Sequence, residues 1–412
     1  VVYGMGERAV LEIARRLDAA PAGADTRAVL HGVPGTAFAG TAAAAPGGDA
    51  PAIELPSHEA ILSDPAKLMA ATLALERQVH QATAWAYQDC GSRRVFFAPP
   101  AAPLSPEELD RLCELPFTRG PHPDYDKPIP AADMVQFSVT GHRGCGGGCS
   151  FCSLALHQGR RIRSRTAGSI RREVAQMTRH PDWKGSVTDV GGPSANMWGA
   201  RCTADPAACM RSSCLTPAIC PSFRADQAGL VRLLRSVERV PGVRHLRVAS
   251  GVRFDLALED EAYVRALVAR YVGGQLKVAP EHASDRVLAL MRKAPFSAFE
   301  RFLTVFERES RRAGKEQYVV PYLLSALPGC TDDDMRALAR WLKARGWKPQ
   351  QVQCFIPTPG TVATAMYWAG IDTEGRPIPV ARTDAERLRQ HRILMPGTGG
   401  KPGARPPRPR RG

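Results

Sequence analysis

The chain has 412 residues, of which 44% are hydrophobic and 23% are charged, an ordinary globular composition with enough apolar material for one large domain and appendages. No apolar run approaches the roughly 18 to 20 residues that cross a bilayer, and the N-terminus lacks the order of a signal peptide, so we expect a cytoplasmic protein without membrane contact. The formal charge of +15 lies partly in the tail, so binding to RNA or DNA is left open but is not favoured.

Residues 1–65 are predicted to be the remnant of an N-terminal α/β domain followed by a loop. Residues 1–18 indicate a strand, a turn and a helix, and Val29–Phe38 indicates another strand. The chain starts at Val1, inside what reads as a strand, so we expect it to be N-terminally truncated. Residues 39–52 are rich in Ala, Gly and Pro and are expected to form a surface loop.

Residues 66–130 are predicted to be a helical and proline-rich linker region. The segment Ala66–Gln88 carries apolar residues at three- and four-residue spacing, which predicts one long amphipathic helix. The sequence Ser105-Pro106-Glu107-Glu108 is a capping box with proline at the first helical position, so it predicts a short helix. Residues 116–130 are too dense in proline for a helix or a central strand.

From residue 131 to residue 395, predicted strands alternate with predicted helices, which implies an α/β domain with a parallel sheet. Six strands are expected near Met134–Thr140, Ser186–Gly191, His245–Ser250, Leu276–Pro280, Tyr318–Leu324 and Val352–Ile356. Helices are expected near Ser169–His180, Gln227–Arg239, Asp260–Tyr271, Ser284–Gly314 in two pieces, Asp332–Arg345 and Thr383–Leu394. Residues 396–412 are basic and lack apolar content, so they are expected to be disordered.

The segment Arg143–Gly159, RGCGGGCSFCSLALHQG, holds Cys145, Cys149 and Cys152 in the pattern C-x-x-x-C-x-x-C. The chain has 11 cysteines, an odd number that favours metal ligation and free thiols over a disulfide framework. Three thiolates can hold three corners of an iron–sulfur cube and leave its fourth position open. The alternatives are weaker, because a zinc site recruits a fourth ligand and buried free cysteines have no reason to gather in a glycine-rich loop.

This motif resembles that of the radical SAM enzymes. The resemblance implies a [4Fe–4S] cluster whose open iron chelates S-adenosylmethionine (SAM), in a partial parallel (β/α)6 barrel with its chemistry at the carboxyl ends of the strands. The first residues resemble the end of a Rossmann-like, cobalamin-binding-type domain. Between about Leu104 and Trp368 the chain is similar to the YgiQ-type radical SAM family, through RGCGGGCSFC, DVGGPSANM, SCLTPAICP, ASGVRFDLA, LKVAPEH and VQCFIPTP.

The resemblance implies that the adenine and the amino group of SAM bind near the first two strands. Phe151, the residue before the last motif cysteine, matches the aromatic or apolar residue beside the adenine. Gly191, Gly192 and Pro193 match a turn whose backbone carbonyls accept hydrogen bonds from the SAM amino group. Proline stands there in place of the usual acid, so only the backbone role is expected.

The third and fourth strands supply further candidates. Ser250 and Arg253 follow the third strand, and the guanidinium of Arg253 suits the SAM carboxylate, with a salt bridge to Asp255 as the alternative. Glu281 and His282 end the fourth strand and are candidate catalytic residues, Glu281 through a ribose contact or a hydrogen relay.

A second cysteine group lies in an insertion at residues 198–224, between the second strand and its helix. The insertion contains several prolines and little apolar periodicity, so a metal could organise it. An auxiliary iron–sulfur cluster and a tetrahedral structural zinc both suit four cysteine ligands. The candidate ligands are Cys202, Cys209, Cys214 and Cys220.

The leading interpretation is a radical SAM enzyme. The resemblance to radical SAM enzymes implies that reductive cleavage of SAM gives a 5'-deoxyadenosyl radical, which abstracts hydrogen from an unknown substrate. It also implies that a donor such as flavodoxin or ferredoxin supplies the electron. An electron-transfer module is less favoured, because a carrier has little use for an open coordination position. The alternative class is a non-catalytic iron–sulfur protein that binds RNA or DNA through Arg160, Arg161, Arg163 and Arg165.

Overall fold

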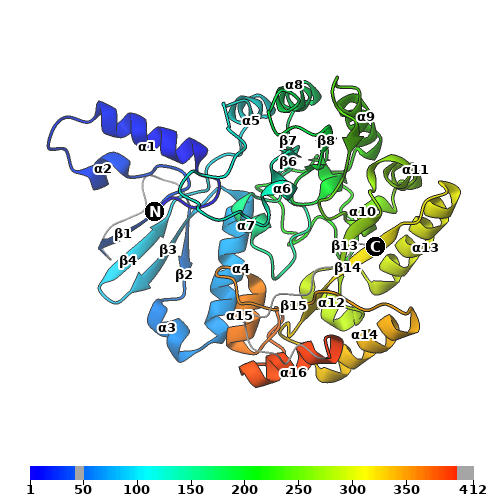
Figure 1. Cartoon of the computed structure of the whole chain (residues 1–412). Coiled ribbons are helices and arrows are strands. Elements are labelled where there is room, and N and C mark those ends of the chain that lie inside the picture. The colour runs from blue at the N-terminus through cyan, green and yellow to red at the C-terminus, as the bar shows by residue number, and fades with distance from the viewer. Residues whose placement is uncertain (42–50, 397–412) are drawn as a thin grey trace.

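The computed structural model describes residues 1–41 and 51–396. Most of the predicted loop at 39–52 and nearly all of the predicted tail at 396–412 lie outside the described residues. Within them, a mixed N-terminal sheet lies beside a larger body in which helices surround short parallel strands (Figure 1). None of the described helices combines the length and the apolar composition that crossing a membrane requires.

The N-terminal sheet has the strand order β1–β4–β3–β2. The strand β4 (Arg93–Phe97) pairs antiparallel with both β1 (Ala37–Thr41) and β3 (Trp85–Cys90), whereas β2 (Ala52–Leu55) pairs parallel with β3. A Rossmann-like sheet is mostly parallel, so this sheet differs from the predicted one. The strand predicted at the start of the chain is a single bridge from Val2.

The predicted helix at 66–88 is wrong in its last turns. The helix α4 (Ala66–Gln81) ends because Ala82 adopts a left-handed backbone with φ 55°, and the chain then enters β3. Aromatic residues of β3, such as Trp85, fall in phase with the helical apolar pattern, so periodicity alone could not find the break. The sheet also crosses the predicted boundary at residue 65, since β3 and β4 lie beyond it.

Short helices complete this part of the molecule. The helix α5 starts with the predicted capping box, in which Ser105 Oγ accepts from the backbone N–H of Glu108 at 3.2 Å and Glu108 Oε2 accepts from the backbone N–H of Ser105 at 2.7 Å. The helices are α1 (Glu7–Ala19), α2 (Thr26–Leu30), α3 (His58–Ser63), α5 (Pro106–Cys113) and α6 (Ala132–Val135).

Within the described residues, parallel strand segments follow one another in hydrogen-bonded order. The strands β8 and β9 form one interrupted segment that pairs with β5 on one side and with β12 on the other. A bridge between Val252 and Val278 continues the order to β13, which pairs with β14, and β14 pairs with β15. The segments are β5 (Ser138–Thr140), β8 (Ser186–Val187), β9 (Asp189–Gly191), β12 (His245–Leu246), β13 (Gln275–Glu281), β14 (Tyr318–Ser325) and β15 (Gln353–Cys354).

Helices alternate with these strands as predicted and cover their outer side (Figure 1). Apolar side chains from both layers form one large buried cluster, in which Val278 of β13 and Phe299 and Phe302 of α13 are fully buried. The helices are α8 (Ala167–Met177), α9 (Gln227–Glu238), α10 (Phe254–Ala257), α11 (Glu261–Ala266) with the π-helical η2 (Leu267–Tyr271), α12 (Asp285–Met291), α13 (Phe296–Arg312), α14 (Asp332–Ala344), α15 (Val362–Ala369) and α16 (Asp384–Leu394).

Two antiparallel pairs close the segments that carry cysteines. The strands β6 and β7 enclose the motif cysteines, and β10 and β11 close the base of the insertion at 198–224. Both segments therefore begin and end at one place on the larger body. The elements are β6 (His142–Arg143), α7 (Leu154–His157), β7 (Arg163–Ser164), η1 (Ala195–Met197), β10 (Arg201–Cys202) and β11 (Phe223–Arg224).

Candidate metal centre

The cysteine loop, residues 143–159, is enclosed by backbone on two sides. A Cβ added to Gly144 would stand 2.2 Å from the carbonyl oxygen of Arg161, and one added to Gly148 would stand 2.2 Å from the carbonyl oxygen of Ser212. Both glycines also have left-handed φ values, +86° and +59°. Neither position accepts a side chain, because the close neighbour is backbone and cannot rotate away.

A third contact comes from the C-terminal half of the chain. The backbone N–H of Ser150 donates to the carbonyl of Met291 at 3.1 Å, and its hydroxyl donates to the carbonyl of Leu290 at 2.7 Å. The carbonyl of Ser150 accepts from the N–H of Ala363 at 2.8 Å. The end of α12 and the start of α15 therefore fix the loop between Cys149 and the next motif cysteine.

The motif sulfurs gather around Gly147. A Cβ at this position would lie 3.4 Å from the sulfur of Cys145, 3.6 Å from the sulfur of Cys149 and 3.1 Å from Nη1 of Arg253. The pKa of the Cys152 thiol is raised to about 11, mainly by burial and to a smaller extent by Cys149 and Cys145, so these two thiols lie within electrostatic reach of Cys152.

These thiols fit a cluster better than a single ion. In the described part of the chain, no three His, Cys, Asp or Glu side chains surround a position for one ion. The ligands of an iron–sulfur cluster bind different irons and need not converge on one point. Burial raises the pKa of Cys145 and Cys152, and a bound metal holds such thiols as thiolates.

Arg253 is fixed from both its side chain and its backbone. Its Nε donates to Asp255 Oδ1 at 3.0 Å, its Nη2 donates to Asp255 Oδ2, and its Nη1 donates to the sulfur of Cys149 at 3.6 Å. Asn196 binds the backbone N–H and carbonyl of Arg253, each at 2.9 Å. Burial by itself raises the pKa of Asp255, but Arg253 outweighs it and lowers that pKa. Arg253 therefore forms the salt bridge to Asp255 that was the predicted alternative to binding the SAM carboxylate. Its Nη1 still faces the cysteine loop.

A buried lysine extends this group of charges. The ammonium of Lys293 lies 3.5 Å from Glu281 Oε1, with side-chain exposures of 4% and 13%, and it also helps to lower the pKa of Asp255. Glu281 in turn raises the pKa of the Cys152 thiol, after burial and the other cysteines, so it lies near the motif. Glu281 has φ +68°, and such strain in a non-glycine residue is typical of functional sites.

The structure does not bring His282 to the same place. Its ring is fully buried, Nδ1 accepts from the backbone N–H groups of Ala283 at 2.9 Å and Ser284 at 3.0 Å, and Nε2 lies 3.6 Å from the sulfur of Cys330. Burial lowers the pKa of His282 to about 4. These contacts stabilise the turn into α12.

The predicted SAM turn lines a large cavity. Gly191, Gly192, Pro193 and Ser250 all face this cavity of about 790 Å³. Asp189 holds Ser250, since its Oδ1 accepts from the backbone N–H of Ser250 at 3.1 Å and its Oδ2 accepts from the hydroxyl. The structure therefore brings these four predicted residues together at the carboxyl ends of β9 and β12.

His142 is a residue of this region that the sequence did not indicate. It also lines the cavity, it is fully buried, and both its ring nitrogens lack a hydrogen-bond partner. Burial lowers its pKa to about 4, so the ring is neutral at physiological pH. A Cβ on Gly192 would stand 2.5 Å from this ring, so glycine is required at the turn. Phe151 is half-buried and packs against the main core.

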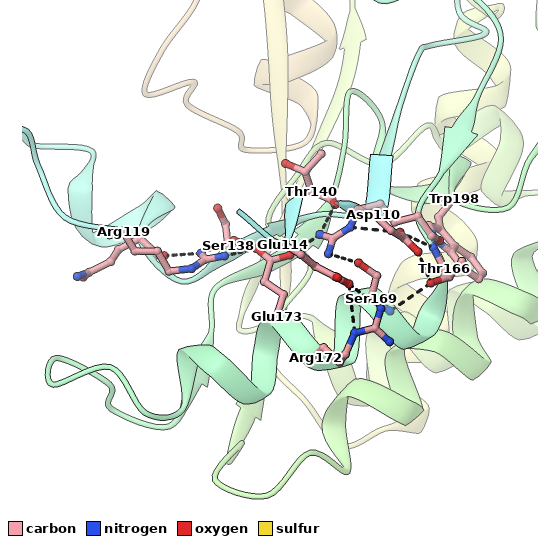
Figure 2. A network of polar contacts seen from close by, with 12 residues as sticks. Asp110, Glu114, Arg119, Ser138, Thr140, Thr166, Ser169, Arg172, Glu173 and Trp198 are labelled. Atoms are coloured by element: carbon pink, nitrogen blue, oxygen red, sulfur yellow. Dashed lines mark hydrogen bonds and ion pairs between the residues drawn. The ribbon is translucent and has the colours of Figure 1, made fainter. Parts of the chain in front are cut away.

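A buried polar network anchors the end of the hairpin that encloses the cysteine loop (Figure 2). Arg165, which is fully buried, donates to Glu173, to the hydroxyl of Ser169 at 2.7 Å and to the carbonyl of Thr140 at 3.2 Å. Arg119 also donates to Glu173. Arg165 is therefore shielded from solvent, with both terminal guanidinium nitrogens engaged inside the fold, which does not favour its predicted place in a nucleic-acid interface.

The second cysteine group packs directly against the cysteine loop. The N–H of Cys214 donates to the carbonyl of Gly146 at 2.9 Å, and the hydroxyl of Ser213 donates to the carbonyl of Gly147 at 2.6 Å. Burial raises the pKa of the Cys214 thiol to about 11, and Cys202, Cys209 and Cys220 add to that rise. The other three predicted ligands thus lie within electrostatic reach of Cys214, beside the motif.

Comparison with known proteins agrees with these motifs. Residues 1–138 match the family model described as Radical SAM N-terminal. A UPF0313 protein of Geobacter sulfurreducens is 46% identical over 400 residues, which cover 96% of this chain and 65% of the relative. A UPF0313 protein of Bacteroides thetaiotaomicron is 39% identical over 418 residues, which cover 96% of this chain and 67% of that relative. A UPF0313 protein of Methanosarcina acetivorans is 40% identical over 420 residues, which cover 96% of this chain and 56% of that relative. The chain thus spans roughly three fifths of the length of these relatives.

Solved structures similar to this chain include two proteins of low sequence identity. The radical SAM methyltransferase TsrM from Kitasatospora setae, with cobalamin and a [4Fe-4S] cluster bound, is 14% identical with a TM-score of 0.40 over 68% of this chain and 48% of that chain. Methylornithine synthase (PylB) is 13% identical with a TM-score of 0.37 over 71% and 70%. On the identity to its relatives, the chain belongs to the UPF0313 family, as its YgiQ-type radical SAM motifs predicted.

Proposed function

We propose that this chain is the catalytic part of a radical SAM enzyme that acts on an unknown substrate. The observation that carries the proposal is the gathering of Cys145, Cys149 and Arg253 around Gly147, with Cys152 close by. Three thiols beside one guanidinium nitrogen that faces them suit a cluster with an open iron and a ligand that bears a carboxylate. When bound, such a cluster supplies the electron that cleaves SAM reductively.

The residues around the cluster site would bind and orient SAM. Asp255 and Asn196 hold Arg253 so that Nη1 faces the cysteine loop, where it could bind the SAM carboxylate as well as the sulfur of Cys149. The carbonyl of Gly191 already accepts from the N–H of Gly141 at 2.7 Å, and its second lone pair suits the SAM amino group.

The remaining predicted residues have unequal support. Glu281 lies near Cys152 and is held by Lys293, so we propose it as a proton or hydrogen relay at this site. Phe151 is proposed to contact the adenine. His282 has its ring nitrogens engaged away from the cavity, which favours a positioning role for it.

Two wider features belong to the same proposal. The ordered parallel segments from β5 to β15 support a partial (β/α)6 barrel, with the cavity at its carboxyl end. A small redox protein such as flavodoxin or ferredoxin is proposed as the electron donor.

The test is anaerobic reconstitution followed by measurement of 5'-deoxyadenosine and methionine. We expect the wild type to release both from SAM when reduced, and Cys149→Ala to release neither. Cys90→Ala is the matched control, because Cys90 is exposed on β3 and belongs to neither cysteine group. A wild type that carries a full, reduced cluster and leaves SAM intact contradicts the proposal.

We also propose a second iron–sulfur cluster at the four cysteines of the insertion. The thiols of Cys202, Cys209 and Cys220 lie within electrostatic reach of Cys214, and among the described residues they form no single-ion site. A tetrahedral zinc would need all four sulfurs at about 2.3 Å from one point. Iron, sulfide and zinc analysis of Cys145→Ala and Cys209→Ala tests it. Loss of about four irons in each variant supports two clusters. Zinc that survives Cys145→Ala and is lost in Cys209→Ala would make the second site structural.

The alternative, a non-catalytic nucleic-acid-binding protein, has less support. Arg165 is fully buried and donates to Glu173, and Arg160 is buried with an exposure of 7%. Binding to RNA or DNA that weakens steeply with salt and ignores SAM would favour this alternative.

A further inference from the structure

A second, smaller cavity lies behind the cysteine loop. It has a volume of about 100 Å³ and is enclosed by residues 3–8, the end of α4, residues 100–104 and residues 156–163. A single water needs roughly 10–15 Å³ of such space, so a polyatomic group fits. We call it the arginine cavity, because five arginines line it: Arg8, Arg143, Arg160, Arg161 and Arg163.

Carboxylates neutralise only part of this charge. Arg143 is paired with Glu7, and Arg8 is paired with Glu108. The other three arginines have no carboxylate partner in the described residues: Arg160 donates only to the carbonyl of Arg211, and the side chains of Arg161 and Arg163 have no hydrogen bond or ion pair.

Buried donors in the same cavity lack partners. Nε of Arg163 and Nε2 of His80 are shielded from solvent and have no hydrogen bond. A buried polar group without a partner is destabilising, so such groups mark places where a ligand or an ion completes the structure. Burial, reinforced by Arg160 and Arg161, lowers the pKa of His80 to about 4, and burial also lowers the pKa of Arg163. An oxyanion would accept from Nε of Arg163 and, in the Nε2–H tautomer of the neutral ring, from Nε2 of His80, and it would oppose the excess charge.

We propose that the arginine cavity binds a phosphate group, either free phosphate or the phosphate of a small metabolite. A guanidinium group presents two parallel N–H donors in a plane, which match two phosphate oxygens. The guanidinium groups of Arg161 and Arg163 line the cavity and have no hydrogen-bond partner among the described residues. The residues enclose a space instead of following a surface track, which suits one oxyanion and not a nucleic-acid strand. The arginine cavity adjoins the cavity lined by the predicted SAM turn, since Met5, Arg143 and Gln158 line both.

Binding here would reach the cysteine loop through the backbone. The carbonyl of Arg161 fills the position that a side chain on Gly144 would need, and the carbonyl of Gly159 accepts from the N–H of Cys145 at 3.1 Å. A ligand that fixes residues 159–163 would therefore stiffen the start of the cysteine loop.

The test is calorimetric titration of the reconstituted protein with inorganic phosphate at a constant ionic strength of about 0.15 M. We expect saturable binding that Arg161→Gln/Arg163→Gln weakens by about tenfold or more, since two charged donors are lost. Arg301→Gln/Arg311→Gln is the matched control: it removes the same charge from exposed arginines of α13 that have no partner among the described residues, and it should bind as the wild type does.

Further arms keep the test decisive. Arg163→Lys keeps the charge without the fork, so we expect an intermediate affinity, and unchanged iron content in each variant would show that the chain has folded. Tighter binding of a phosphomonoester than of phosphate would identify a metabolite, and the reverse would identify the free anion. No saturation at millimolar phosphate, equal binding by the double variant, or preferred binding of a single-stranded RNA through the same arginines would overturn the proposal.

Discussion

Nη1 of Arg253 lies 3.6 Å from the sulfur of Cys149, while Asp255 accepts from the other two guanidinium nitrogens. Asp255 therefore holds the positive charge of Arg253 beside the sulfur of Cys149, and the negative charge of Asp255 lies on the opposite edge of the guanidinium group. Charge and hydrogen bonds at the sulfurs are among the factors that set the reduction potential of an iron–sulfur cluster.

Arg253→Gln should lower the reduction potential of the cluster, because it removes the positive charge and the donor beside Cys149. We expect a shift on the order of 50 mV, close to a tenfold change in a one-electron equilibrium. An EPR-monitored redox titration measures it. The double variant Arg253→Gln/Asp255→Asn removes both charges and should shift less; an equal shift in both variants would argue against the electrostatic cause.

Gly148→Ala should prevent cluster loading at the cysteine loop. The new Cβ would meet the carbonyl of Ser212 at 2.2 Å, so either the loop or the insertion has to move. Gly314→Ala is the control, because Gly314 has a similar φ of +64° and open space around it. Iron content per chain should fall sharply in the first variant only. Equal loss in both would assign the effect to backbone strain.

Lys293→Met should destabilise the fold by about 1–3 kcal/mol, because it leaves the half-buried Glu281 without its partner. Adding Glu281→Gln should restore part of the loss. Chemical denaturation measures both, with the exposed Lys343→Met as the control, which should stay within about 0.5 kcal/mol of the wild type. If the double variant is less stable than the single one, the two side chains do not act as a pair.

His282 should make the fold sensitive to acid. Its folded pKa of about 4 lies below the ordinary value of 6.5, so between these values the unfolded chain binds a proton that the folded chain does not. The contribution is complete above pH 6.5 and is lost as the pH falls towards 4, by about 3 kcal/mol in total. His282→Gln should flatten this part of the stability curve measured by denaturation from pH 7 to pH 4. An unchanged slope would contradict the assignment.

The features predicted well are those written locally in the sequence. Spacing alone indicated that the motif cysteines lie close together, while their role as cluster ligands stays a prediction. The alternation of strand and helix patterns indicated the parallel segments from β5 to β15. The pairing of Arg253 with Asp255 was also predictable, since the two residues are close in sequence. Caps such as Ser105 at α5 were confirmed for the same reason.

The features missed depend on packing between distant segments. Asn196 binds the backbone of Arg253 from 57 residues away, and nothing in its own surroundings indicates that role. The sequence around Lys293, between α12 and α13, contains no sign of a buried partner. The pair forms only because the fold places the end of β13, with Glu281, beside it. The end of α4 at Ala82 depends on β2 and β4, which make Trp85 and its neighbours more stable as a strand.

The hydrogen bond from Ser213 to the carbonyl of Gly147 joins residues that are 66 positions apart. On the ribosome the cysteine loop therefore emerges well before the segment that covers it. During that interval the loop is open on the side that Ser212 and Cys214 later occupy. The cysteine loop can therefore reach its final enclosure only after the insertion has been synthesised and has docked.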